Sequence, residues 1–405
     1  MALGLVTRLR HLATRLPPAG AIAVIYVAAR LTTTGFLLLA AQLSGPASRF
    51  GTRPSLGVLA MGWDAQWYWT IAYSGYPSTL PADAAGTVAE NAWAFMPIYP
   101  WVSNTLGAVV GGYPVAAPVV SLIAGYFACL ALAALLRSRL DRAATLWAVA
   151  FFAAGPLAAI FQIGYAESLF LLWLLLALLA VERRRWWWLY ALVPLLAFTR
   201  PGVLAFSLFL ALYGIWRFVR RRTDPLPPSQ IVHIVVSGLL AAALGLLWPV
   251  ITGIATGDPQ AYLHTELAWR RSWIGDHGGF VPFDGAVRAA ALWFELWGLP
   301  SWLGPAALVT VIVAVALVLI FSRHVRRLGV PTQLWSASYL LYLLAVFFPQ
   351  SSTFRLLLPL APLTGALAAP RSTPWRVSVL LAGLVAQAGW IVAMYAFGNT
   401  YWQVP

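Results

Sequence analysis

Long apolar runs alternate with short polar segments along most of the chain, which predicts a bundle of membrane-spanning helices. A helix needs roughly 20 predominantly apolar residues to cross about 30 Å of hydrocarbon. We predict about eleven spans, within a range of nine to twelve: residues 20–43, 115–136, 144–163, 167–181, 186–199, 202–218, 231–255, 302–321, 332–348, 356–369 and 377–397. The fourth, fifth and tenth are short, so we expect one of them to be broken, re-entrant or strongly tilted.

Two long stretches, residues 44–114 and 256–301, interrupt this pattern. If the N-terminus lies in the cytoplasm, alternation of the spans places both stretches on the outer side of the membrane. Aromatic residues are frequent in them, which is typical of interfacial helices. We therefore expect a single transmembrane domain over residues 1–405 with two outer loops, and we expect any chemistry to lie on that outer face.

The arginines support this orientation, because cytoplasmic loops of membrane proteins carry an excess of positive charge. All 26 basic residues are Arg. Eighteen fall in the N-terminal segment or in inner turns: Arg8, Arg10, Arg15, Arg137, Arg139, Arg142, Arg183, Arg184, Arg185, Arg217, Arg220, Arg221, Arg222, Arg323, Arg326, Arg327, Arg371 and Arg376. Seven fall outside, Arg49, Arg53, Arg200, Arg270, Arg271, Arg288 and Arg355, and Arg30 lies within the first span.

Composition excludes a soluble protein. Hydrophobic residues make up 61% of the chain and charged residues 9%, whereas an ordinary soluble domain carries roughly 25% charged residues. The net charge of +14 is then largely a topology signal and does not indicate a nucleic-acid-binding surface. The lone Cys129 lies in an apolar run, which favours a small core residue.

The first outer loop contains one carboxylate among aromatic residues, in the run Trp63-Asp64-Ala65-Gln66-Trp67-Tyr68. A partly desolvated carboxylate in such a place can act as a general base on a hydroxyl group, and the neighbouring rings can stack on sugars. The alternative is an interfacial helix in which Asp64 caps the first turn or faces water.

Three further charged residues lie at outer ends of predicted spans. Glu167 opens the fourth span, where the helix dipole favours an anion, so it is either a capping or a functional residue. Arg355 and Arg200 lie at outer turns. Arginine suits bidentate binding of phosphate, although snorkelling toward lipid headgroups is the alternative.

The second outer loop adds His264, Glu266, Arg270, Arg271 and His277. The spacing of its two histidines is not typical of a metal site. The chain also contains no nucleotide-binding glycine motif and no His-Glu-x-x-His sequence, so nucleotide-driven transport and zinc chemistry have no support.

These motifs resemble those of the GPI mannosyltransferase V (PIG-V) family, in the same order along the chain. The resemblance rests on Trp63-Asp64-Ala65 with Gly75-Tyr76, on Ala94-Phe95-Met96-Pro97, on Tyr165-Ala166-Glu167-Ser168-Leu169-Phe170, and on Arg355 with Pro359. The chain differs from the family pattern at Gly155, at Ala166 and at Thr199-Arg200-Pro201.

The resemblance implies a bacterial glycosyltransferase of the GT-C fold, a multi-helix membrane protein that moves a sugar, typically mannose, from a polyprenyl phosphate to a glycolipid or lipoglycan. It implies inversion at the anomeric carbon, with Asp64 as general base. The residues that would bind the acceptor or position the base are Glu167, Trp63, Tyr68 and Tyr165. Arg355, Arg200, Arg270, Arg271 and His264 are the candidates for binding the donor phosphate. No cofactor and no metal are expected, because the Asp-x-Asp pair of metal-dependent relatives is absent.

Two alternatives remain open. The same chemistry fits arabinofuranose, galactofuranose or glucose on the donor, and a lipid flippase or non-catalytic scaffold could have the same layout. The expected location is the bacterial plasma membrane, with an extracytoplasmic active site. The expected partners are the lipid-linked donor, the acceptor and membrane lipids, without nucleic acid.

Overall fold

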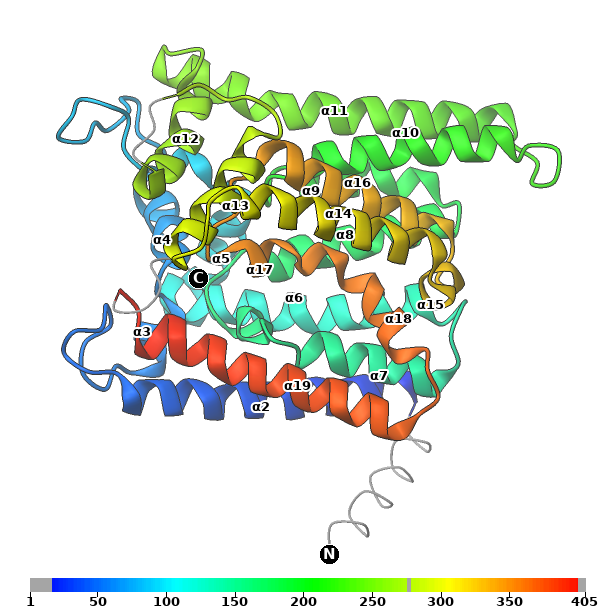
Figure 1. The fold of residues 1–405 in the computed structure, drawn as a ribbon, viewed down its shortest axis with the longest axis horizontal. Coiled ribbons are helices and arrows are strands. Elements are labelled where there is room, and N and C mark those ends of the chain that lie inside the picture. The colour runs from blue at the N-terminus through cyan, green and yellow to red at the C-terminus, as the bar shows by residue number, and fades with distance from the viewer. Residues whose placement is uncertain (1–16, 275–277, 400–405) are drawn as a thin grey trace, which may run out of the picture.

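The computed structural model describes residues 17–274 and 278–399, and its elements are helices (Figure 1). Arg8, Arg10, Arg15 and His277 lie outside the described residues. The α-helices are α2 (Pro18–Leu43), α3 (Leu56–Ala60), α4 (Asp64–Ser74), α5 (Ile98–Val110), α6 (Tyr113–Leu136), α7 (Arg142–Ala153), α8 (Glu167–Glu182), α9 (Leu189–Ala197), α10 (Val203–Val219), α11 (Pro228–Thr256), α12 (Ala261–Ile274), α13 (Asp284–Leu296), α14 (Leu303–Phe321), α15 (Arg323–Arg327), α16 (Val330–Val346), α17 (Thr353–Leu356), α18 (Thr364–Ala368) and α19 (Thr373–Ile391). Short 3-10 helices are η1 (Ala92–Ala94), η2 (Ala158–Gln162), η3 (Trp186–Trp188) and η4 (Leu358–Leu363), and α19 continues as the π-helical η5 (Val392–Ala396).

The prediction of an all-helical membrane protein is confirmed. Each of the eleven apolar runs contains helix. Within residues 17–274 and 278–399, five helices are long and apolar enough to cross a membrane: α2, α6, α11, α14 and α19 with η5. The tenth run is broken into α17, η4 and α18, in line with the expectation for the short runs.

The third run is also broken, which the sequence analysis did not predict. α7 ends at Ala153 and the chain resumes as η2 at Ala158. Pro156 lacks a backbone N–H and disfavours helix at Gly155 before it, so the α-helix cannot continue through this point. A break within an apolar helix bundle leaves carbonyl groups that need partners from the protein, because lipid offers none.

Two polar side chains from other helices satisfy those carbonyls. Arg30 of α2 donates to the carbonyl oxygens of Ala153 and Ala158, and Gln387 of α19 donates to the carbonyl of Gly155 at 3.2 Å. The Arg30 guanidinium also lies 5.3 Å from the ring centre of Phe161. Arg30 therefore fixes the geometry of the segment that leads to Glu167.

We expect replacement of Arg30 by leucine to destabilise the protein, because two buried carbonyl groups lose their donor. Each unsatisfied buried group costs about 1–3 kcal/mol, so the loss of two should lower the free energy of unfolding by about 2–6 kcal/mol. Denaturation of the purified protein in detergent measures this loss. Leu31→Ala, at an exposed position of the same helix, is the control and should change little.

The two ends of the bundle differ in character. The helices lie side by side, with α3, α4 and α12 at one end and α15 and the turn between α10 and α11 at the other (Figure 1). At the second end, Arg139 binds Glu182 at 2.6 Å and Arg184 binds Asp224 at 2.7 Å. The described arginine-rich turns therefore gather at one end of the molecule, opposite both long connections.

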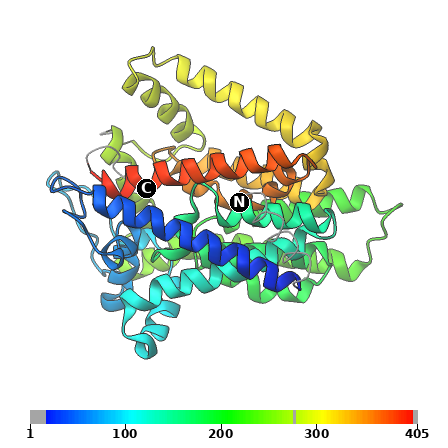
Figure 2. The same ribbon diagram turned by 90° about the horizontal axis from the view of Figure 1, so that it is seen from below.

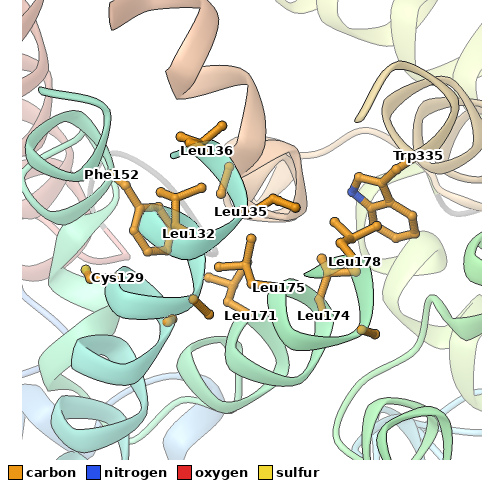
Figure 3. Packing of buried hydrophobic residues seen from close by; sticks show 14 of the residues in the cluster. Cys129, Leu132, Leu135, Leu136, Phe152, Leu171, Leu174, Leu175, Leu178 and Trp335 are labelled. Atoms are coloured by element: carbon orange, nitrogen blue, oxygen red, sulfur yellow. The ribbon is translucent and has the colours of Figure 1, made fainter. Parts of the chain in front are cut away.

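The core is built where α6 and α8 face each other. Figure 3 shows Leu132 and Leu135 of α6 beside Leu171 and Leu175 of α8, with Phe152 of α7 and Trp335 of α16 at the edges. Gly125 allows close approach of α2, since a Cβ atom there would lie 2.4 Å from the Tyr26 hydroxyl. Small residues at helix contacts are typical of membrane proteins. Cys129 is fully buried in this core, as predicted.

Helices α13 and α14 form a hairpin that projects away from the rest of the bundle (Figure 2). The side chains of α14 are mostly exposed and apolar, with only Gly304 and Leu319 buried. An apolar helix exposed in this way is suited to contact with lipid.

Candidate active site

Asp64 is the first residue of α4, and the local backbone directs it toward the bundle. The preceding Trp63 has φ 56° and ψ −128°, a conformation that non-glycine residues rarely adopt. Burial of the Trp63 side chain and its hydrogen bond from Nε1 to the carbonyl of Met394, at 3.1 Å, hold this conformation. The backbone N–H of Asp64 donates to the Tyr165 hydroxyl at 3.3 Å. The backbone conformation at Trp63 and the hydrogen bond to Tyr165 thus set the position of the Asp64 carboxylate.

Four charged side chains from distant parts of the sequence form one connected cluster. The Nη1 atom of Arg355, in α17, contacts Oδ2 of Asp64 and lies 3.2 Å from Oε1 of Glu167, the first residue of α8. Arg200, in the turn after α9, contacts Oε1 of the same Glu167. We call these four residues the charge cluster.

The charge cluster is buried and neutral as a whole. Asp64, Glu167 and Arg355 are 8%, 3% and 7% exposed, so an unpaired charge at any of them would be costly. Two carboxylates balance two guanidinium groups. Among the described residues, Glu167 Oε2 and Arg355 Nε are buried without a hydrogen-bond partner.

Aromatic side chains support the charge cluster. The Arg355 guanidinium lies 5.2 Å from the ring centre of Tyr165, whose carbonyl oxygen accepts a hydrogen bond from Ser121 at 3.0 Å. Tyr68 packs edge-on against Phe95 and Tyr99. Burial raises the pKa of Tyr68 well above its ordinary value, so its hydroxyl stays protonated and able to donate.

The charge cluster borders a cavity of about 510 Å³. Other parts of its wall come from α10, α11, α12 and α16, and include Trp248, Tyr262, Trp269, Tyr339 and Tyr342. Pockets of this size, with apolar walls and a few convergent polar groups, are typical of small-molecule sites. The cavity and the charge cluster together can bind an anion through the arginines and a hydroxyl group through a carboxylate.

The structure brings together six of the ten residues that the sequence analysis selected. Asp64, Tyr68, Glu167, Arg200, Arg270 and Arg355 line the cavity. Trp63 and Tyr165 are buried behind it and hold Asp64 and Arg355 in place. Arg270 reaches the cavity while pairing with Asp284 at 3.0 Å.

The remaining two residues do not line the cavity. His264 is hydrogen-bonded to Asp258 at 3.0 Å, and Arg271 donates to the carbonyl of Val88 in the first outer loop. His264 therefore pairs within its own loop, whereas Arg271 fastens α12 to the first outer loop.

Glu266 lines the cavity, although the sequence analysis gave it no role. It is accessible from the cavity, yet burial by the surrounding protein raises its pKa to about 7, against the opposing effects of Tyr262 and Arg200. A sequence signal existed, because Tyr262, Glu266 and Arg270 recur every four residues and so share one helical face.

Metal ligation finds no support in residues 17–274 and 278–399. Within these ranges no group of three or more His, Cys, Asp or Glu side chains is arranged to hold a metal ion. The expectation of a reaction without a metal or cofactor stays a prediction.

Comparison with known proteins yields one distant structural likeness. No family model and no curated protein matches the chain. A crystal structure of the Archaeoglobus fulgidus oligosaccharyltransferase, tethered to an acceptor peptide containing the NVT sequon, is similar with 13% identity and a TM-score of 0.37. The match covers 93% of this chain and 56% of that one, so the chain spans little more than half its length. A likeness this distant identifies neither the fold family nor the reaction.

Proposed function

We propose that the protein is a membrane glycosyltransferase of the GT-C type, which transfers mannose from a polyprenyl phosphate to a glycolipid or lipoglycan acceptor. The observation that carries the proposal is the charge cluster beside a cavity with aromatic walls. Within one site, Asp64 can accept the proton of a hydroxyl nucleophile, and the arginines can bind a phosphate leaving group.

The proposed reaction is a single displacement. The acceptor hydroxyl oxygen attacks the anomeric carbon of the donor sugar, and its proton passes to the carboxylate of Asp64. The bond between that carbon and the phosphate oxygen breaks, and polyprenyl phosphate leaves with the electron pair. Arg355 and Arg200 stabilise the negative charge that develops on the phosphate. A β-linked donor gives an α-linked product.

Arg355 links the two halves of this reaction. In the free protein its guanidinium is paired with the carboxylate of Asp64. A phosphate ester accepts the same donors, so donor binding draws Arg355 away and leaves Asp64 open to the acceptor hydroxyl. Glu167 keeps Arg200 and Arg355 together through one oxygen atom, which makes it a positioning residue for the phosphate.

The arrangement of charge supports an extracytoplasmic site. The charge cluster belongs to the end of the bundle that carries both long connections, and the described arginine-rich turns lie at the opposite end (Figure 1). By the positive-inside rule, the arginine-rich end faces the cytoplasm. The donor sugar must then be presented in the outer leaflet.

Transfer assays with different donors test the proposal directly. Purified protein in lipid nanodiscs receives radiolabelled polyprenyl phosphate bearing mannose, glucose, galactofuranose or arabinofuranose, together with a membrane glycolipid extract. We expect label in the glycolipid fraction only with the mannose donor. Transfer from a different donor alone would overturn the assignment of mannose, and no transfer from any donor would overturn the glycosyltransferase itself.

A further inference from the structure

Helix α12 is fastened to the first outer loop, which also carries Asp64. The side-chain amide of Asn91 donates to the Thr265 hydroxyl at 2.9 Å, and both residues are buried. The ring of Trp269 packs edge-on against Trp67 and Phe95, each with a centroid separation of 6.0 Å. These contacts fix the position of Glu266, between Thr265 and Trp269 on the same helix, relative to the charge cluster.

Glu266 differs from the other two glutamate and aspartate residues of the cavity wall. Asp64 and Glu167 are each held by arginine. Glu266 forms no ion pair within the described part of the chain, and its hydrogen-bond partner is Tyr262 on its own helix. The other titratable or charged groups that act on it are Tyr342 of α16 and Arg200. Its carboxyl group is therefore available to a ligand in the cavity.

The surroundings of Glu266 suit a sugar ring. A carboxylate accepts hydrogen bonds from neighbouring hydroxyl groups of a polyol, and such charge-assisted bonds are about twice as strong as neutral ones. Aromatic side chains such as Tyr262 and Tyr342 offer flat apolar surface to the C–H face of a sugar ring. Arg200, which contacts Glu167 in the charge cluster, lines the same cavity as Glu266.

We propose that Glu266 is a specificity-determining residue that binds hydroxyl groups of a sugar ring in the cavity. The inference rests on the proposed function, because it treats that sugar as part of the transfer reaction. Glu266 holds the ring, while Asp64 and the arginines act on the atoms that react.

The interaction should depend on pH near neutrality. The pKa of Glu266 is raised to about 7, so the accepting carboxylate form is a minority at pH 6 and predominates at pH 8. Sugar binding should therefore strengthen as pH rises through this interval. A carboxylate with an ordinary pKa is already fully ionised at pH 6 and would give no such change.

The test uses full-length protein in nanodiscs and two measurements. Equilibrium binding of radiolabelled octyl α-mannoside reports on the sugar subsite without turnover, and mannosyl transfer reports KM and kcat. We expect Glu266→Gln to weaken octyl mannoside binding and to raise KM roughly 10- to 100-fold, with kcat within a few-fold of wild type. It should also abolish the rise in affinity between pH 6 and pH 8.

Two variants make the result specific. Glu266→Asp keeps the charge and should retain the pH dependence with intermediate affinity. Glu295→Gln removes an exposed glutamate of α13 outside the cavity wall and should behave like wild type. If Glu266→Gln does not fold, the octyl mannoside affinity of Glu266→Asp, compared with wild type, decides the question.

The outcomes separate the two proposals. The role of Glu266 is overturned if the wild-type affinity for octyl mannoside does not change between pH 6 and pH 8. It is also overturned if Glu266→Gln keeps its affinity and KM. Both results leave the transferase proposal intact. Octyl mannoside binding that depends on Glu266, in a protein that transfers no sugar, supports the subsite and overturns the transferase proposal.

Discussion

Replacing Asp64 by asparagine is expected to lower the rate of sugar transfer by at least ~100-fold, because a positioned general base contributes at least that factor. Asparagine has nearly the same shape and keeps a hydrogen-bond acceptor, so the backbone at Trp63 and the contact with Tyr165 should persist. The amide cannot take the proton of the acceptor hydroxyl. The loss should therefore appear in kcat, with donor binding largely retained.

Single-turnover transfer and donor binding, measured on the same preparation, check this result. Asp83→Asn is the matched control, since Asp83 lies in the same outer loop, is exposed and takes no part in the cavity wall. It should transfer sugar at the wild-type rate. Unchanged transfer by Asp64→Asn would refute the assignment of Asp64 as the base.

Removal of Arg355 should be at least as damaging, for two separable reasons. Arg355→Ala deletes the donor that stabilises the leaving phosphate, a type of loss that commonly costs about 100- to 1,000-fold in kcat. It also leaves two buried carboxylates, those of Asp64 and Glu167, with Arg200 as the one remaining guanidinium of the charge cluster. Breaking a buried ion pair from one side destabilises a protein by about 3–5 kcal/mol.

A double variant separates the two effects. Asp64→Asn combined with Arg355→Gln removes one charge of each sign, so the destabilisation should be smaller than the sum of the single variants. Binding of sugar-free polyprenyl phosphate should still weaken roughly 10- to 100-fold, because the loss of the guanidinium is not compensated. Arg371→Ala, exposed at the opposite end, is the control. Undiminished binding of polyprenyl phosphate to Arg355→Ala would exclude Arg355 as the phosphate ligand.

The hydrophobic pattern predicted the spans because membrane helices must satisfy their own backbone and must be apolar. It missed the break at Gly155 and Pro156, where a proline interrupts an otherwise apolar run. Arg30 and Gln387 reach this break from helices far away in the sequence and satisfy its carbonyl groups. Such a contact depends on how the helices pack against each other, which the hydrophobic pattern of the sequence does not predict.

The charge cluster was predictable residue by residue, but its connections were not. Asp64 stood out as a carboxylate among aromatic residues of the first outer loop, and Glu167, Arg200 and Arg355 stood out as charges at the outer ends of apolar runs. Sequence could not show that one oxygen atom of Glu167 serves both arginines. On α12, helical spacing separates the residues: Glu266 and Arg270 share the cavity face, whereas His264 and Arg271 point away from it.

The neutrality of the charge cluster has a consequence for turnover. In the proposed mechanism, the product phosphate lies against Arg355 after transfer, and the carboxylate of Asp64 competes with it for that guanidinium. Asp64 carries the acceptor's proton at that moment and cannot compete until the proton has left. In this proposed mechanism, loss of that proton to the outer medium restores the carboxylate of Asp64, which then competes for Arg355 and favours release of polyprenyl phosphate.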